Sequence, residues 1–131
     1  MEQKDRELLM KEICARIPYR TWFKFSYKDP YGRKSYSKSI IEGVSFPYYI
    51  EHFTLTGKER LHIETSEIQL YLFPMSSMTE EQEREYLNTC NGYCTYYWTD
   101  ETFDWLNENH FDYKHLIEKG LAIDATNLNI Y

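Results

Sequence analysis

Two cysteines and two histidines have spacings that resemble those of zinc ligands. Cys90 and Cys94 lie in the segment CNGYC, and His110 and His115 follow in NHFDYKHL. A structural zinc ion needs four such ligands converging at about 2.0–2.3 Å. Asp112 stands between the histidines, where we expect it to begin a helix, so the two imidazoles do not share one helical turn. We therefore predict no metal or other cofactor and a turn in which the thiols pack inside. A structural zinc site is the alternative.

A second group of residues could bind single-stranded nucleic acid. Lysines and arginines between residues 16 and 38 alternate with exposed aromatic candidates such as Tyr19 and Tyr36, and Asp29 is the only acid among them. Cations neutralise phosphates and rings stack on bases, which is how small β domains hold single strands. The alternative is a solvated strand face, and the net charge of −6 disfavours nucleic acid. The cationic candidates are Arg16, Arg20, Lys24, Lys28, Arg33, Lys34 and Lys38.

Aromatic residues also indicate a protein interaction surface. The chain has 13 Tyr, 7 Phe and 3 Trp, so much of the core must be aromatic, with tyrosine hydroxyls reaching the surface. Such rings give a large contact area at low entropic cost. The segment YCTYYW, residues 93–98, is either exposed or folds back to plug the end of the β unit. The candidate interaction residues are Trp22, Tyr31, Tyr48, Tyr49, Tyr96, Tyr97 and Trp98.

Catalysis has little support in the sequence. Asp112 with His110 or His115 could form an acid–base pair, and Cys94 could be a nucleophile, but no pattern places them in one cleft. The five glycines are too scattered to form a phosphate-binding loop. We predict a protein that is not an enzyme.

Composition narrows the class of protein. With 131 residues, one domain is expected. No apolar run is long enough to span a membrane, and the charged N-terminus does not resemble a signal peptide. Three cysteines favour reduced thiols and a cytoplasmic location. Residues 1–60 carry 12 Lys/Arg against 8 Asp/Glu, whereas residues 61–131 carry 3 against 13, which predicts two regions of opposite potential.

The hydrophobic period changes twice along the chain. Residues 1–18 have helical spacing, residues 19–74 alternate as short strands, and residues 75–131 return to helical spacing with caps at Thr79, Thr99 and Asp112. Between two of the strands, a three-residue loop at 57–59 would align Phe53 with Ile63, so we predict that loop over an even one.

The predicted fold is α+β. It consists of an N-terminal helix, a small antiparallel β-barrel or meander of the Src-homology-3-like kind, and two or three C-terminal helices. A flat antiparallel sheet covered by helices is the alternative.

Three segments resemble a family of small uncharacterised proteins from gut bacteria and their phages and mobile elements. They are ICARIPY (13–19), YLFPMSSMTEEQEREY (71–86) and DWLNENHFDYKHLIEKGLAIDA (104–125). The family pattern runs ARLPY, PYLRPMSSMTEEE and WLNxHHFDYRGLIxKGLA, and this chain departs from it at Phe73 and His115. The resemblance implies no activity or site residue. The leading hypothesis is a non-enzymatic interaction or accessory module of a bacterial or phage mobile element, with an unidentified protein partner. We expect no association with a membrane, and the sequence does not indicate the oligomeric state.

Overall fold

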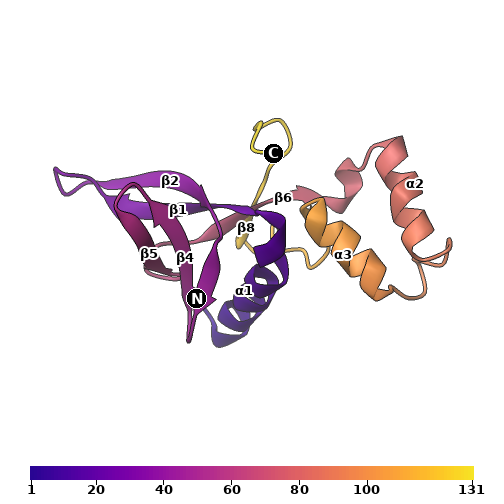
Figure 1. The fold of residues 1–131 in the computed structure, drawn as a ribbon, viewed down its shortest axis with the longest axis horizontal. Helices are drawn as coiled ribbons and strands as arrows, with labels where there is room; N and C mark the ends of the chain where they lie inside the picture. Colours follow the sequence, from indigo (N-terminus) through magenta and orange to yellow (C-terminus); the bar gives the residue numbers. More distant parts are fainter.

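The computed structural model describes all residues from 1 to 131 (Figure 1). Helix α1 (Gln3–Arg16) ends in a 3₁₀ turn (Ile17–Tyr19). Helices α2 (Glu80–Thr89) and α3 (Asp100–Glu108) follow a region of short strands. The strands before the helices are β1 (Trp22–Lys28), β2 (Lys34–Ile40), β3 (Gly43–Ser45), β4 (Tyr49–Thr54), β5 (Gly57–His62) and β6 (Gln69–Pro74), and β7 (Phe111–Asp112) and β8 (Ala122–Asp124) come after them.

The strands form two sheets. One has the order β2-β1-β6-β7, with β8 also paired to β6, and the other has the order β3-β4-β5. Most neighbours are antiparallel, but β6 pairs with both β7 and β8 in parallel. The α+β class is confirmed, with an N-terminal helix and two C-terminal helices. No closed barrel forms, and the sheets are mixed, so the purely antiparallel barrel is wrong. Likeness to the Src-homology-3 fold stays a prediction.

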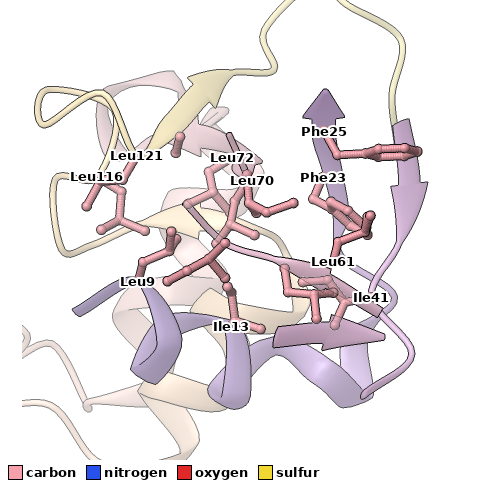
Figure 2. Packing of buried hydrophobic residues seen from close by; sticks show 14 residues of the cluster. Leu9, Ile13, Phe23, Phe25, Ile41, Leu61, Leu70, Leu72, Leu116 and Leu121 are labelled. Atoms are coloured by element: carbon pink, nitrogen blue, oxygen red, sulfur yellow. The ribbon is translucent and has the colours of Figure 1, made fainter. Parts of the chain in front are cut away.

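One hydrophobic core lies between the two sheets and α1 (Figure 2). Leu9 and Ile13, four residues apart on α1, are fully buried and face the sheets. Phe23 and Phe25 on β1 are also buried, and the Trp22 and Lys24 side chains that alternate with them are half-buried. The rhythm of two residues in this region therefore predicted the correct inward face. No helix of the chain combines the length and hydrophobicity needed to cross a bilayer.

The hairpin of β4 and β5 differs from the prediction. Thr54 pairs with Gly57, so the loop has two residues, and Phe53 faces Lys58 instead of Ile63. Phe53 is 60% exposed, while His52 is buried with its ring 5.1 Å from that of Phe25. The prediction failed because it placed Phe53 inward, which would turn its neighbour His52 outward. This imidazole packs edge-on against phenylalanine rings and takes the inward position.

The two C-terminal helices begin at the predicted caps. Thr79 accepts a hydrogen bond from the Gln82 amide (3.1 Å), and the Gln82 side chain accepts one from the Thr79 amide (2.9 Å). Thr99 and Thr102 form the same reciprocal pair at the start of α3. Each box satisfies two amides that the first helical turn leaves unpaired.

The predicted helical lobe from residue 75 is helical only as far as Glu108. The chain then returns to the larger sheet as β7 and β8. Asp112 does cap, since its carboxylate accepts from the amides of Leu116 (2.8 Å) and Ile117 (2.9 Å), but it caps a series of turns and not a third helix. Gly120 has φ +75°, the left-handed conformation predicted for it.

Candidate functional site

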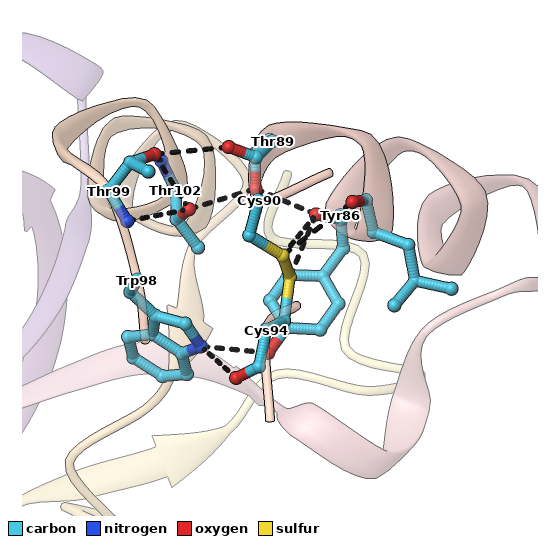
Figure 3. Close-up of a disulfide and its surroundings, with 8 residues drawn as sticks. Tyr86, Thr89, Cys90, Cys94, Trp98, Thr99 and Thr102 are labelled. Atoms are coloured by element: carbon cyan, nitrogen blue, oxygen red, sulfur yellow. Dashed lines mark hydrogen bonds between the residues drawn. A yellow bond between two sulfur atoms is a disulfide. The ribbon is translucent and has the colours of Figure 1, made fainter. Parts of the chain in front are cut away.

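The four candidate zinc ligands do not form a site. Cys90 and Cys94 are joined in a disulfide, with Cα atoms 5.3 Å apart (Figure 3). The prediction of reduced thiols is therefore wrong for this pair, and only Cys14 is free. Because these two cysteines are not reduced, they do not support the predicted cytoplasmic location. No three His, Cys, Asp or Glu side chains converge in a way that could hold a metal ion.

The two histidines occupy different environments. The His110 ring stacks on the Tyr131 ring at 3.7 Å, and its Nδ1 lies 3.4 Å from Thr21 Oγ1. Burial, with a smaller contribution from the Arg16 charge, lowers the pKa of His110 to about 4. His115 is exposed, and its Nδ1 lies 3.9 Å from Glu118. With Asp112 occupied by two amides, none of these groups forms the acid–base pair considered from the sequence.

The seven aromatic candidates are dispersed over three regions. Trp22 lies at the start of β1, and Tyr31 is 82% exposed in the loop after that strand. Tyr49 begins β4 and Tyr48 lies in the turn before it, and both rings pack against His62. Only Tyr96, Tyr97 and Trp98 belong together, in the loop between α2 and α3. A single aromatic surface made of all seven residues is not formed.

The loop that carries these three residues does not plug the β unit. It lies at the outer end of the α2–α3 pair, away from both sheets (Figure 1). Tyr96 is 82% exposed and Tyr97 57% exposed, with Tyr93 beside them at 56%. Trp98 turns inward, and its Nε1 donates to Tyr86 Oη (3.0 Å) and to the Cys94 carbonyl (3.1 Å) (Figure 3). The exposed alternative for segment 93–98 is therefore correct for its tyrosines.

The seven basic candidates separate into two groups. Arg16 is fully buried, where its Nη2 donates to the Phe111 carbonyl at 2.8 Å. Arg20 is exposed before β1 begins, and Arg33 pairs with Asp29 (3.1 Å) in the loop after β1. The other four residues, all lysines, are on one face of the β1–β2 pair. In the register of these strands, Lys24 stands opposite Lys38 and Lys28 opposite Lys34.

Aromatic rings lie between these lysines. Lys24 Nζ is 4.3 Å from the centre of the Tyr36 ring, and Lys38 Nζ is 5.9 Å from that of Trp22. Tyr71 on β6 joins the same face, because it alternates with Leu70, which pairs with the inward Phe23. We call this surface the lysine face and define it as Trp22, Lys24, Lys28, Lys34, Tyr36, Lys38 and Tyr71. The alternation of QLYLF indicated Tyr71, although the sequence argument did not use it.

A hollow lies within the lysine face. Its volume is about 340 Å³, and Lys24, Tyr36, Ser37, Lys38 and Tyr71 line it, with no carboxylate among them. Burial raises the pKa of the Tyr71 phenol. Like charges opposite each other on neighbouring strands repel, so Lys24 and Lys38 create a positive potential that an anion would relieve.

Two acids lie beside this face, because Glu64 and Glu67 line a pocket together with Lys24 and Tyr36. Glu67 accepts from Lys34 Nζ (2.8 Å) and from Tyr36 Oη (3.2 Å). These hydrogen bonds lower the pKa of Glu67, and the same pairing raises the pKa of Lys34. Lys24, Lys28 and Lys38 form no ion pair. Glu67 was missed from the sequence because a residue in a turn has no periodic signal.

The acidic residues are concentrated at the other end of the molecule. Residues 79–108 hold eight Asp/Glu and one Lys/Arg, a net charge of −7, and form the α2–α3 pair and its loop. Residues 22–40 hold five Lys/Arg and one Asp, a net charge of +4. Figure 1 shows that the β1–β2 hairpin and the α2–α3 pair lie at opposite ends of the long axis. The negative net charge therefore does not lie over the lysine face.

The three segments that resemble a known family meet at one place. Arg16 from the first segment reaches the backbone of Phe111 in the third, and Phe73 from the second pairs with Phe111. The Arg16 guanidinium also lies 5.2 Å from the Tyr113 ring. These residues join α1, β6 and β7, which is a structural role. Comparisons with protein-family models, with curated proteins and with solved structures find no match for the chain, so membership of that family stays a prediction.

Proposed function

We propose that this protein is a non-enzymatic module that binds single-stranded nucleic acid through the lysine face. The observation that carries the proposal is the placement of four lysines and three aromatic rings on one side of β2-β1-β6, around a hollow without a carboxylate. Lysines supply sequence-independent attraction to phosphates, and ring faces stack on bases of any sequence. Together they favour a polyanion that also carries aromatic groups.

The net negative charge of the chain, which disfavours nucleic acid, is concentrated away from the lysine face. An excess of acids repels nucleic acid only where those acids lie close to it, because the screening length is about 8 Å at physiological ionic strength. The α2–α3 pair, with its net charge of −7, extends away from the β1–β2 hairpin (Figure 1). The acids beside the lysine face are Glu64 and Glu67, and Glu64 is already paired with Arg6 and the N-terminal ammonium group.

The geometry favours this function over a single aromatic interaction surface. The seven aromatic candidates are dispersed, whereas four of the seven basic candidates share one face with Trp22 and Tyr36 between them. The accessory role in a mobile element is a separate part of the proposal. That role rests on the resemblance of the three segments alone.

The test is fluorescence anisotropy with a short fluorescein-labelled oligodeoxythymidine. The double variant Lys24→Gln/Lys38→Gln removes the lysines that line the hollow. Its control is Lys4→Gln/Lys11→Gln, which makes the same change of charge at two exposed positions of α1. If binding neutralises one phosphate per lysine, losing two contacts weakens binding by roughly fiftyfold at about 50 mM salt.

The Lys4→Gln/Lys11→Gln control distinguishes binding at the lysine face from a general effect of the protein's net charge. We expect the α1 variant to bind within about threefold of the unmodified protein, because neither Lys4 nor Lys11 lines the hollow of the lysine face. Equal losses in the two variants would refute a localised site. Tighter binding to a duplex than to the single strand would refute the role of stacking rings.

A further inference from the structure

We infer that the tip of the α2–α3 pair binds a cationic peptide segment, one rich in arginine or lysine. This site shares no residue with the lysine face and does not depend on the proposed function. It is a shallow, open depression of about 380 Å³, lined by Cys94, Thr95, Tyr96, Tyr97, Trp98 and Phe103. We call this depression the tip hollow.

The tip hollow offers ring surface and no cation. The polar Nε1 of Trp98 is already used by Tyr86 Oη and the Cys94 carbonyl, so the indole presents no free donor (Figure 3). The Phe103 ring packs edge-on against Trp98, with ring centres 5.3 Å apart. What remains accessible is the π surface of the lining residues together with the Tyr96 and Tyr97 hydroxyls. Such a surface attracts cations through the ring quadrupole.

Elsewhere in this protein, several exposed or half-buried rings already have a cation over them. Arg33 lies 5.2 Å from the Tyr31 ring, Arg60 4.7 Å from that of Tyr49, and Lys58 5.9 Å from that of Phe53. The lysine face repeats the pattern at Tyr36 and Trp22. No lysine or arginine of the chain lies over Tyr93, Tyr96 or Tyr97. Tyr93, Tyr96 and Tyr97 therefore lack the cation that Tyr31, Tyr36 and Phe53 have, as do the exposed rings of Phe46 and Tyr27.

The negative charge around the tip also favours a cationic partner. None of the eight carboxylates of residues 79–108 forms an ion pair. Asp100 and Glu101 lie in the first turn of α3, directly after the loop. Unpaired rings and unpaired carboxylates at one end of the molecule both select a positively charged ligand over an anionic or purely apolar one.

The loop is held in place before any ligand binds. The Cys90–Cys94 disulfide closes its first half, and the Tyr93 amide donates to the Cys90 carbonyl at 2.8 Å. At the other end, Thr99 Oγ1 donates to the Thr89 carbonyl (3.0 Å) (Figure 3). A ligand that docks here does not have to order the loop, which lowers the entropic cost of binding.

The test uses a short fluorescein-labelled peptide of alternating glycine and arginine, and a matched peptide with citrulline in place of arginine. Citrulline keeps the shape of arginine and removes its charge. We expect the arginine peptide to bind and the citrulline peptide to bind at least tenfold more weakly. Equal binding of the two peptides would overturn the inference.

The variant Tyr96→Ser/Tyr97→Ser separates the tip hollow from general attraction to an acidic surface, because it leaves the charge unchanged. Both side chains are exposed, so the fold is retained. We expect it to weaken binding of the arginine peptide about tenfold, as the loss of two ring contacts implies. Tyr31→Ser, an equally exposed tyrosine outside the tip, is the control and should have no effect.

Two results of the experiments with Tyr96→Ser/Tyr97→Ser would overturn the inference. One is binding of the arginine peptide that is unchanged in Tyr96→Ser/Tyr97→Ser, which would reduce the effect to surface charge. The other is a dimer of the free protein in sedimentation that the same variant abolishes. That dimer would show that the tip is covered by a second copy of the chain.

Discussion

Arg16 is the residue whose replacement tests most sharply how the three chain segments are joined. It is fully buried, and Glu12, its only acidic partner, lies 3.4 Å away and is 2% exposed. Nη2 also donates to the Phe111 carbonyl, whereas Nε and Nη1 have no partner. Burial raises the pKa of Glu12 in spite of Arg16, so desolvation outweighs the attraction between the two charges. The pair thus fixes the position of α1 against β7 without being an optimal ion pair.

We expect Arg16→Met to lower the free energy of unfolding by about 3 kcal/mol. The charge-assisted bond to Phe111 contributes about 1.5–3 kcal/mol, and removal of one partner from a buried pair typically costs about 3–5 kcal/mol. Loss of the two unpaired N–H groups offsets part of that cost. Adding Glu12→Met should restore stability to within about 1 kcal/mol of the unmodified protein, because well-packed apolar side chains often replace a buried pair without loss.

Urea unfolding followed by circular dichroism measures all four members of this double-mutant cycle, with the slope of the unfolding free energy against urea as a check that the denatured state is unchanged. A change below about 0.5 kcal/mol in Arg16→Met would refute the role given to the buried guanidinium. A double variant as unstable as the sum of the two single variants would refute the claim that desolvation limits the pair.

Three further changes test other parts of the fold. The pKa of His110 is about 4 in the folded protein, below its value of about 6.5 in an unfolded chain, so its contribution to stability is present above pH 6.5 and is lost as the pH falls toward 4. After allowance for partial exposure, we expect this loss to be about 1–2 kcal/mol in urea titrations at acid pH. His110→Asn, which is compatible with the φ of +62° at this position, should abolish the loss. Replacing Cys90 and Cys94 by serine should cost roughly 2 kcal/mol by the loop-entropy relation, and an unchanged melting temperature after reduction would contradict a closed loop in solution. Asp112→Ala leaves the Leu116 and Ile117 amides unpaired and should cost about 2 kcal/mol, whereas Asp112→Asn, which keeps one acceptor, should cost less; equal losses would argue against the cap.

The sequence predicted those elements whose signal is local. Phe23 and Phe25 alternate with polar neighbours, and their inward face was correct. Thr79 and Thr99 cap through their own side chains within one helical turn, so their role can be recognised without tertiary information. Periodicity and caps depend on short stretches of chain, and for that reason they were reliable.

Elements that depend on distant partners were not predicted. The strand β7 has two residues, too few to show any period, and it forms only because Phe73–Pro74 offers a parallel edge. The predicted inward position of Phe53 would turn His52 outward, although the contacts of His52 are with phenylalanine rings. For Arg16 a signal was present and overlooked, since it follows Leu9 and Ile13 at the spacing of one buried helical face.

The candidate site was predicted in part for the same reason. The alternation of β1 and β2 is local, so Lys24, Lys28, Lys34 and Lys38 could be placed on one strand face from sequence. The opposition of Lys24 to Lys38 depends on strand register, and the contribution of Tyr71 depends on the pairing of β6 with β1. The aromatic composition of the loop at residues 93–98 is visible in the sequence. Only the tertiary structure shows that its tyrosines are exposed and do not plug the β unit.

The salt dependence of oligonucleotide binding is the most direct measurement of the central claim, that the lysine face neutralises phosphates. With four lysine contacts, the logarithm of the association constant should fall with the logarithm of salt concentration at a slope of about −2.8, and affinity should fall about fiftyfold between about 50 and 200 mM. In Lys24→Gln/Lys38→Gln the slope should be about −1.4, with a fall of about sevenfold. A slope in this variant equal to that of the unmodified protein would contradict the account, since the bound phosphates would then lie somewhere other than the lysine face.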